Sequence, residues 1–160
     1  MSNKAIFLDR DGVINKERNY TYTLNDFVLL PDLFEALLEL RKKGYLLIVV
    51  SNQGGIAKGL YGKSDVELLH NYLKAHLKKE DIDLAEIYYC PHHDEYGKCI
   101  CRKPNSLLIE KAIGRFNIDP SKSFFIGDKQ RDVDAGARVG VQGFLIESNS
   151  SLLNLIDKIP

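Results

Sequence analysis

Five short apolar runs, separated by stretches with helical spacing, restrict the fold of this chain more than any other feature. The runs cover residues 5–9, 45–51, 85–90, 123–128 and 143–147. Continuous apolar runs of this length are typical of strands that are buried on both faces of a parallel sheet. We therefore expect an α/β fold, a three-layer sandwich around a central parallel sheet.

The stretches between these runs carry apolar side chains at helical spacing. The first expected helix stops before Gly44, and the second has Ser64 as its expected N-cap. The C-terminal tail has the pattern of a last helix that closes the sheet. The expected helices cover residues 33–43, 64–77, 107–116, 131–139 and 151–159.

Length and charge exclude several classes of protein. A chain of 160 residues fits one domain, which we expect to span residues 1–160. Lys plus Arg equal Asp plus Glu at 22 each, so no net field favours nucleic acid or an anionic membrane. No run approaches the ~18 apolar residues that a membrane span needs, and the N-terminus lacks a signal-type stretch. We expect a cytoplasmic monomer with neither nucleic acid nor membrane as a partner.

Polar side chains stand at the ends of the first four apolar runs. Asp9, Ser51, Cys90 and Asp128 each close a run. Because ligands of open parallel sheets bind at the carboxyl ends of the strands, we expect these side chains to converge on one edge.

An acidic pair, Asp9 and Asp11, follows the first run, and Gly12 gives the turn freedom to approach a ligand. Two neighbouring carboxylates repel each other, and Mg²⁺ relieves this by accepting oxygen ligands. The alternative is an ordinary Asp-Gly turn with solvated acids.

Groups suited to holding a phosphate follow the second run and precede the third helix. Ser51 offers a hydroxyl, and the backbone N–H groups of residues 52–55 could cradle an anion. Arg102 can grip a phosphate bidentately, and Lys103 can neutralise one oxygen. A Gly-rich turn and a surface basic pair are the simpler alternatives.

Asp128 and Asp132 follow the fourth run. An acid at a buried strand end is costly without a partner, and a metal ion is the natural one for Asp128. Asp132 either supports the site or caps the helix that begins there.

A cysteine-rich stretch, about residues 90–103, carries the spacing of a metal site. An odd number of cysteines in a reducing compartment favours metal over disulfides. Three thiolates and one imidazole complete a closed tetrahedral site, which is typical of structural zinc. His93 is an alternative to His92, and redox sensing is an alternative to zinc. The expected zinc ligands are Cys90, His92, Cys99 and Cys101.

The order of these motifs resembles the haloacid dehalogenase (HAD) superfamily of phosphotransferases. The matching segments are DRDGV at 9–13, SNQ at 51–53, RKP at 102–104 and GDKQRD at 127–132. The resemblance implies that Asp9 is the nucleophile and that Asp11 is the general acid and base. It also implies that Ser51 and Lys103 hold the phosphoryl group. The implied Mg²⁺ ligands are the Asp9 carboxylate, the Asp11 backbone carbonyl and Asp128.

With the zinc loop, the chain resembles D-glycero-D-manno-heptose 1,7-bisphosphate phosphatases and the related histidinol-phosphate phosphatases. NQGGIAKG is similar to the heptose branch, whereas the five residues between His93 and Cys99 are more like the histidinol branch. The resemblance favours a phosphorylated sugar as the substrate, with removal of the C7 phosphate for surface-glycan synthesis. Histidinol phosphate is the alternative.

The spacing of the motifs leaves no room for a cap domain, so loops must shape the substrate pocket. We expect His70 and His76 to lie at the surface or flank of the second helix, away from the strand ends. The implied substrate contacts are Arg18, Asn19, Tyr20, Asn52, Gln53, Gly54, Arg102 and Lys129.

Two other classes fit less well. A phospho-receiver signalling domain also uses an aspartate, Mg²⁺ and a lysine, but it places its acids on different strands and has no zinc cluster. A zinc-dependent nucleic-acid module conflicts with the zero net charge.

Overall fold

The computed structural model describes residues 1–160 and contains one parallel five-stranded sheet. The strand order is β3-β2-β1-β4-β5, so the chain starts in the centre and builds outward to both sides. All four strand pairs are parallel, as the apolar runs indicated. The strands are β1 (Lys4–Leu8), β2 (Tyr45–Asn52), β3 (Glu86–Cys90), β4 (Phe124–Gly127) and β5 (Gln142–Leu145).

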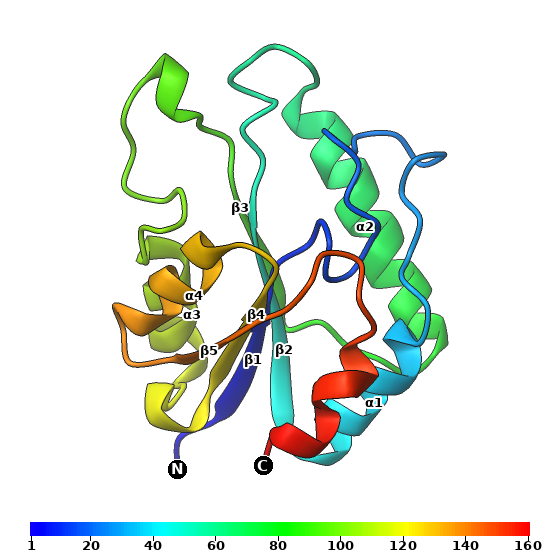
Figure 1. The fold of residues 1–160 in the computed structure, drawn as a ribbon, viewed down its shortest axis with the longest axis vertical. Helices are drawn as coiled ribbons and strands as arrows, with labels where there is room; N and C mark the ends of the chain where they lie inside the picture. The colour runs from blue at the N-terminus through cyan, green and yellow to red at the C-terminus, as the bar shows by residue number, and fades with distance from the viewer.

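Helices cover both faces of the sheet and complete the expected three layers (Figure 1). The first two helices and the C-terminal 3-10 turn pack on one face, and the other two helices pack on the opposite face. The α-helices are α1 (Leu33–Lys42), α2 (Lys63–Lys79), α3 (Leu107–Phe116) and α4 (Gln130–Ala137). The 3-10 helices are η1 (Asp94–Tyr96), η2 (Pro120–Lys122) and η3 (Leu152–Lys158).

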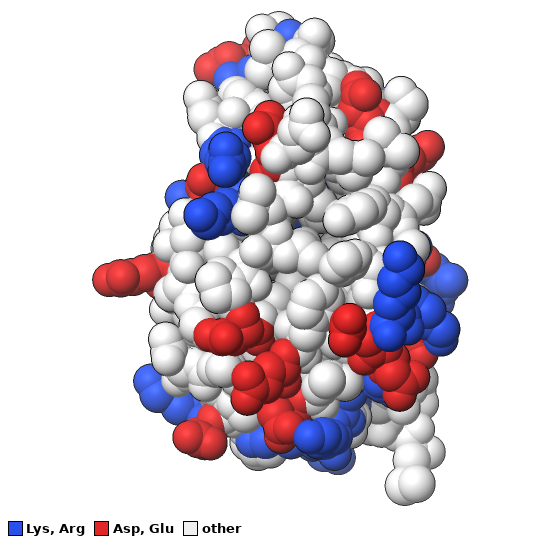
Figure 2. All heavy atoms as spheres, turned by 90° about the vertical axis from the view of Figure 1, so that its right-hand side faces the viewer, with Lys and Arg blue, Asp and Glu red and all other residues white.

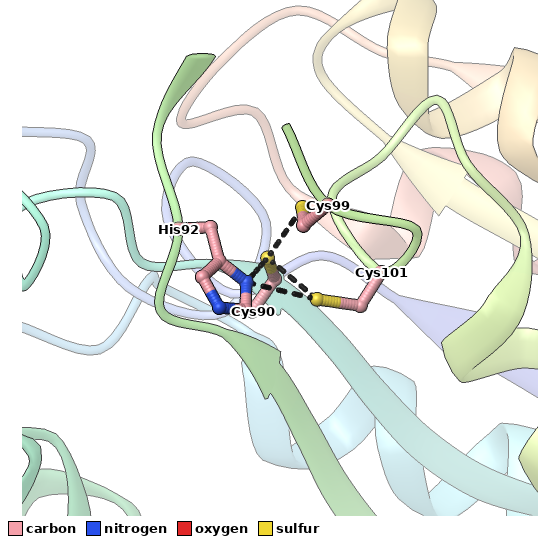
Figure 3. A group of neighbouring side chains, drawn as sticks. All are labelled: Cys90, His92, Cys99 and Cys101. Atoms are coloured by element: carbon pink, nitrogen blue, oxygen red, sulfur yellow. Dashed lines mark hydrogen bonds between the residues drawn. The ribbon is translucent and has the colours of Figure 1, made fainter. Parts of the chain in front are cut away.

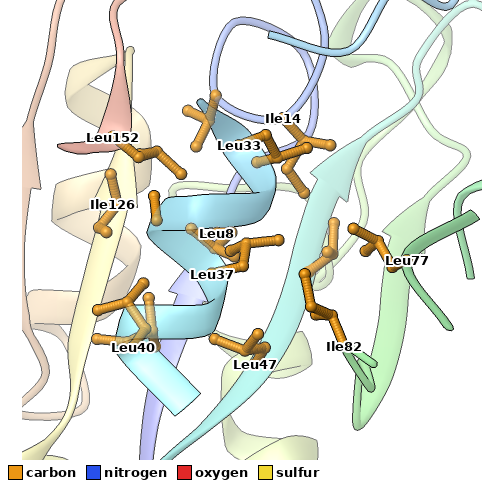
Figure 4. Close-up of a cluster of buried hydrophobic side chains, with 14 of the residues drawn as sticks. Leu8, Ile14, Leu33, Leu37, Leu40, Leu47, Leu77, Ile82, Ile126 and Leu152 are labelled. Atoms are coloured by element: carbon orange, nitrogen blue, oxygen red, sulfur yellow. The ribbon is translucent and has the colours of Figure 1, made fainter. Parts of the chain in front are cut away.

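The larger part of the core lies beneath α1 (Figure 4). Leu33, Leu37 and Leu40 recur every three or four residues along α1 and are at most 1% exposed. They pack against strand side chains such as Leu8 and Leu47. Burial of a Leu or Ile side chain stabilises the fold by about 1.5–3 kcal/mol, so this layer fixes the position of β1 and of the loop that follows it.

Three local features differ from the expectations. The N-cap of α2 is Gly62, whose N–H donates to the Asp65 carboxylate at 2.8 Å, whereas Ser64 lies inside the helix. The tail forms the 3-10 helix η3 rather than an α-helix. The last expected helix before β5 begins at Gln130 and ends at Ala137, slightly earlier than the pattern indicated.

The connections after β1, β2 and β3 extend beyond the same end of the sheet, opposite the two termini (Figure 1). They hold no inserted domain, only turns, isolated bridges and η1, so the chain is capless as the motif spacing required. No helix has the length and apolar character that spanning a membrane requires. On the face that Figure 2 shows, acidic and basic side chains lie side by side without a continuous basic stripe.

Candidate active site

A polar cleft of about 460 Å³ opens at the carboxyl ends of the strands. Its walls come from the loops after β1, β2, β3 and β4, which meet here because parallel strands all end at the same edge. The lining residues are Asp9, Asp11, Glu17, Asn19, Tyr20, Thr21, Asn52, Gln53, Gly54, Tyr61, His93, Arg102, Lys129 and Arg131.

A buried lysine joins two carboxylates at the floor of this cleft. Lys103 Nζ lies 2.9 Å from Asp9 Oδ1 and 2.7 Å from Asp132 Oδ1, and it donates to the Val50 carbonyl at 2.7 Å. Burial alone would lower the pKa of Lys103, but Asp9 and Asp132 outweigh it and raise the pKa above its ordinary value. Burial raises the pKa of Asp9, and Lys103 opposes that shift. Lys103 is therefore a fixed cation beside the Asp9 carboxylate.

Asp132 has both of the roles that the sequence left open. Its Oδ2 accepts the N–H of Lys129 at 3.1 Å, as an acid in the first turn of α4 should, while its Oδ1 faces Lys103. The side chain is fully buried. A helix-terminal contact thus holds the acid that supports Lys103.

Asp128 stands beside Asp9 with one oxygen unused. Asp128 Oδ1 is buried and has no hydrogen-bond partner, whereas Oδ2 accepts from the Ser148 hydroxyl. Burial raises the pKa of Asp128. One carboxylate oxygen each from Asp9, Asp128 and Asp132 lies within 4.8 Å of the others. Hard oxygen donors in this arrangement, with one lacking a partner, fit a magnesium ion.

Asp11 is held by three side chains, two from its own loop and one from the loop after β2. Arg10 Nη2 donates to Asp11 Oδ1 at 2.9 Å, and Asn15 Nδ2 donates to the same oxygen at 2.9 Å. Gln53 Nε2 donates to Asp11 Oδ2 at 3.1 Å. The Asp11 side chain is 20% exposed and lines the cleft. Its carboxylate is therefore both fixed and accessible.

Ser51 lies outside the lining of the cleft, whereas Asn52 is part of it. Ser51 is fully buried, and its Oγ accepts from Gln53 Nε2 at 2.8 Å, so it does not line the cleft. Asn52 lines the cleft but also clamps the backbone of Lys103. Its Oδ1 accepts the Lys103 N–H at 3.0 Å, and its Nδ2 donates to the Lys103 carbonyl at 3.1 Å.

The cysteine-rich loop brings its four expected ligands together (Figure 3). Cys90 Sγ lies 2.9 Å from Cys101 Sγ and 3.7 Å from Cys99 Sγ. His92 Nδ1 lies 3.4 Å from Cys90 Sγ and 3.2 Å from Cys101 Sγ. All four ligand atoms lie within 4.8 Å of one another, and their chemistry fits a closed zinc site. His93 points elsewhere and lines the cleft.

The loops around the cleft hold most of the expected substrate contacts. Arg18 is outside the lining: its side chain is half exposed and lies 3.9 Å from Asp26. The remaining expected contacts all line the cleft. Five further lining residues had not been singled out as substrate contacts, although Glu17 and Thr21 lie in the expected pocket loop 15–23 and His93 lies in the zinc loop: Glu17, Thr21, Tyr61, His93 and Arg131. Arg131 lies within the GDKQRD segment, so its motif position was an available signal.

Two buried residues near Asp11 also went unrecognised. Arg10 is fully buried, although it stands between the two acids of the motif. His70 was expected at the surface of its helix, and this expectation was wrong, because it is only 5% exposed and lies 3.3 Å from Arg10 Nη1. The spacing was an available signal, because His70 lies four residues after Val66 and three before Leu73, on the apolar face of α2.

Comparison with known proteins gives consistent results. The family model for HAD-hydrolase-like proteins matches residues 100–157. The D-glycero-β-D-manno-heptose-1,7-bisphosphate 7-phosphatase of Haemophilus influenzae is 44% identical over 140 residues, which cover 84% of this chain and 76% of that protein. The D-glycero-α-D-manno-heptose-1,7-bisphosphate 7-phosphatase of Campylobacter jejuni is 41% identical over 149 residues, covering 93% of this chain and 84% of that protein.

A solved structure supports the same relationship. The D,D-heptose 1,7-bisphosphate phosphatase from B. bronchiseptica, crystallised with magnesium and phosphate, superposes with a TM-score of 0.84 at 28% identity. The match covers 91% of this chain and 81% of that one.

Proposed function

Because this chain belongs to the D-glycero-D-manno-heptose-1,7-bisphosphate 7-phosphatase family of the HAD superfamily, we propose that it hydrolyses the C7 phosphate of D-glycero-D-manno-heptose 1,7-bisphosphate. The relatives that match most of this chain are phosphatases, which hydrolyse a phosphate monoester. The observation that carries the proposal is the Asp9–Lys103–Asp132 ion-pair chain beside the unpartnered oxygen of Asp128. The named relatives favour the heptose substrate over histidinol phosphate.

Asp9 would be the nucleophile. Its carboxylate attacks the phosphorus in line, the bond to the C7 oxygen breaks, and an aspartyl-phosphate forms on Asp9. Lys103 lies 2.9 Å from that carboxylate and would offset the charge that develops on the phosphoryl oxygens. Asp132 and the Val50 carbonyl would keep the ammonium in place.

Asp11 would be the general acid and then the general base. As a general acid it protonates the leaving sugar oxygen, and as a base it then accepts a proton from the water that hydrolyses the aspartyl-phosphate. Its position on the cleft wall, held by Arg10, Asn15 and Gln53, supports this role. The first half-reaction releases the sugar and leaves the phosphate on Asp9, and the second releases inorganic phosphate and restores the free enzyme.

Asp9, Asp128 and the backbone carbonyl of Asp11 would hold magnesium. When bound, Mg²⁺ supplies Lewis-acid stabilisation of the phosphoryl oxygens and relieves the repulsion between the carboxylates. The magnesium and phosphate in the related B. bronchiseptica structure support this assignment.

The remainder of the substrate would be held by the cleft walls. Arg102 and Lys129 supply cationic groups for the phosphate that is not cleaved, and Asn19 and Tyr20 supply polar groups for the sugar. We propose that zinc in the cysteine cluster is structural and holds the segment that carries Arg102 and Lys103. The product would feed the synthesis of a heptose-containing surface glycan.

The experiment is a substrate panel measured with and without Mg²⁺. The panel contains the α and β anomers of heptose 1,7-bisphosphate, fructose 1,6-bisphosphate and histidinol phosphate, with phosphate release as the readout. We expect a heptose bisphosphate to have the highest kcat/KM and activity to vanish when Mg²⁺ is withheld. A clear preference for histidinol phosphate would overturn the substrate assignment.

The nucleophile is tested by Asp9→Asn, which we expect to abolish turnover because an amide cannot form the acyl-phosphate. The matched control is Asp134→Asn, the same change at an exposed acid of α4 that accepts only from Gln130. Normal activity in Asp9→Asn, or equal loss in both variants, would contradict the mechanism.

A further inference from the structure

A guanidinium group without any exposed surface lies directly behind the cleft. Arg10 is fully buried, and its N–H groups reach three different segments of the chain. Nε lies 3.2 Å and Nη2 2.9 Å from Asp11 Oδ1. Nη2 also donates to the carbonyl of Thr21 at 2.9 Å, and Thr21 belongs to a wall of the cleft. A buried charge of this kind is costly unless its donors are satisfied, so its partners are part of its function.

His70 is the side-chain partner of the remaining terminal nitrogen. It comes from α2, and its Nε2 lies 3.3 Å from Arg10 Nη1. Burial, reinforced by the charge of Arg10, lowers the pKa of His70 to about 3. The imidazole is therefore neutral near pH 7, and Nε2 can accept a hydrogen bond from the guanidinium.

Aromatic rings hold both members of this pair. The Tyr89 ring lies edge-on to His70 with the centroids 5.5 Å apart, and the guanidinium carbon of Arg10 lies 5.6 Å from the centroid of Phe27. These rings leave the imidazole and the guanidinium little room to turn. The direction in which Arg10 presents its Nε and Nη2 edge is consequently set by the core.

The two carboxylate oxygens of Asp11 accept different numbers of hydrogen bonds. Oδ1 receives donors from Arg10 Nε, Arg10 Nη2 and Asn15 Nδ2 within 3.2 Å. Oδ2 accepts from Gln53 Nε2 and from Arg10 Nη2, both at 3.1 Å. Because Oδ1 is already crowded with donors, Oδ2 is the oxygen with capacity for a further proton or ligand.

We propose that Arg10 and His70 are positioning residues that orient the Asp11 carboxylate so that its Oδ2 exchanges the proton with the leaving group and with water. His70 acts through Arg10 and touches no reacting atom. This inference rests on the proposed role of Asp11 as the general acid.

Comparing two leaving groups distinguishes the positioning of Asp11 from a purely structural role, because a structural role would affect kcat/KM for both substrates alike. A sugar alkoxide is a poor leaving group and needs protonation as the phosphorus–oxygen bond breaks, whereas p-nitrophenolate leaves without a proton. The value of kcat/KM reports only steps up to phosphoryl transfer, so it isolates leaving-group departure from later hydrolysis. A misplaced Asp11 should therefore impair heptose bisphosphate and spare p-nitrophenyl phosphate.

The experiment compares both substrates for His70→Leu, His70→Gln and Arg10→Lys, with melting temperatures recorded for each. We expect His70→Leu to lower kcat/KM for heptose bisphosphate by about 10- to 100-fold, because Nη1 loses its acceptor and the guanidinium shifts. The loss with p-nitrophenyl phosphate should stay below about threefold. His70→Gln should recover most of the difference, since its Oε1 can accept from Arg10. Arg10→Lys should repeat the selective loss, because one ammonium cannot bridge three partners.

The matched control is His76→Leu, the same change on the same helix at a residue that contacts Tyr72 and Phe34 and is remote from the cleft. Equal losses with both substrates in His70→Leu and Arg10→Lys, or no loss in either, would overturn the positioning role. Asp11→Asn separates the two proposals. If it shows the selective loss while the other variants do not, only this inference fails; if it shows none, the role of Asp11 fails and the inference falls with it.

Discussion

Asp128 carries one buried oxygen without a partner, beside two further carboxylates. Lys103 brings one positive charge to Asp9 and Asp132, and its Nζ is committed to those two acids and to the Val50 carbonyl. Asp128 has only the Ser148 hydroxyl and a 3.7 Å contact with Lys129. When all three acids are ionised, the site therefore has two more negative charges than Lys103 can balance, and a bound divalent cation would supply the difference.

We predict that Asp128→Asn separates metal binding from folding. The raised pKa of Asp128 shows that burial disfavours its charged form, so a neutral amide should leave the metal-free melting temperature unchanged or higher. Saturating Mg²⁺ at about 100 times its Kd should stabilise the original protein by ~2.7 kcal/mol and the variant hardly at all. Thermal melts with and without Mg²⁺ measure this, with Asp134→Asn as the control.

The acids of the site and Lys103 were predictable from the sequence, and the buried guanidinium of Arg10 was not. Asp9 and Asp128 follow apolar runs, and the ends of parallel strands meet at one edge regardless of how the side chains pack. Arg10 and His70 are brought together by the packing of α2 against the first loop, 60 positions apart in sequence. No local pattern encodes that contact. Ser51 was expected to hold the phosphoryl group; it is fully buried, and its Oγ accepts from Gln53 Nε2 outside the lining of the cleft.

Two strand-to-loop junctions set the geometry of the site at the level of elements. At the end of β4, Gly127 packs directly against the Asp132 side chain at the start of α4. At the end of β3, Cys90 begins the cysteine-rich loop and stands opposite Asn52 of β2 in the sheet register. Both junctions contact groups that hold Lys103: the first through Asp132 and the second through Asn52. Small backbone shifts at either junction would therefore displace a catalytic group.

We predict that Gly127→Ala abolishes most activity. A methyl group at this position would overlap Asp132, and the displaced acid would release Lys103. A 1 Å displacement of such a group costs about 100-fold in rate. The control is Gly114→Ala in α3, where a methyl group meets nothing within 4 Å. That change should raise stability by about 0.5–1 kcal/mol and leave kcat/KM as it was, measured by denaturant melts and phosphate release.

Removal of zinc should loosen the loop before it affects magnesium. Chelation, or Cys99→Ser, should lower the melting temperature and accelerate amide exchange over residues 91–102, because the proposed zinc would join the two ends of this segment. The Kd for Mg²⁺ should change little at first, since its expected ligands lie directly after β1 and β4, outside the cysteine-rich loop. Ile100→Ser is the control, an exposed neighbour in the same loop that offers no ligand. Unchanged melting after complete zinc removal would refute the structural role.

The elements themselves followed from the sequence to within a few residues. Apolar runs located all five strands: β1, β2 and β4 are almost entirely buried, whereas the edge strands β3 and β5 are apolar but only partly buried. Helix ends were less certain, since the Gly62–Asp65 contact competes with Ser64 for the start of α2. The shape of the tail depended on the surface that receives it, which is a tertiary property.

Across the whole molecule, the C-terminal tail completes the hydrophobic layer beneath α1. Leu152, Leu155, Ile156 and Ile159 are each at most 9% exposed and belong to the main core cluster. Lys43 Nζ donates to the carbonyl of Ile156 at 2.7 Å. The first and last parts of the fold therefore depend on each other.

We predict that deletion of residues 151–160 unfolds much of the population. Four buried aliphatic side chains contribute about 1.5–3 kcal/mol each, which is comparable with the ~5–15 kcal/mol of a whole domain. Denaturant melts should show a transition at far lower urea, or none. Deletion of Met1 and Ser2, which are exposed, is the control and should shift the midpoint little. A truncated chain with a near-normal midpoint would show that the tail is dispensable.

The side-chain clamp of Asn52 on the Lys103 backbone has a consequence for how the enzyme matures. Asn52 is paired with Cys90 in the sheet register, and its side-chain amide bonds both the N–H and the carbonyl of Lys103. A newly made chain that has closed its sheet but not yet captured zinc would possess every catalytic group while the span leading to Lys103 was still slack. The supply of zinc would then determine when magnesium-dependent hydrolysis begins. Scarcity of zinc would leave folded but inactive enzyme rather than a smaller amount of protein.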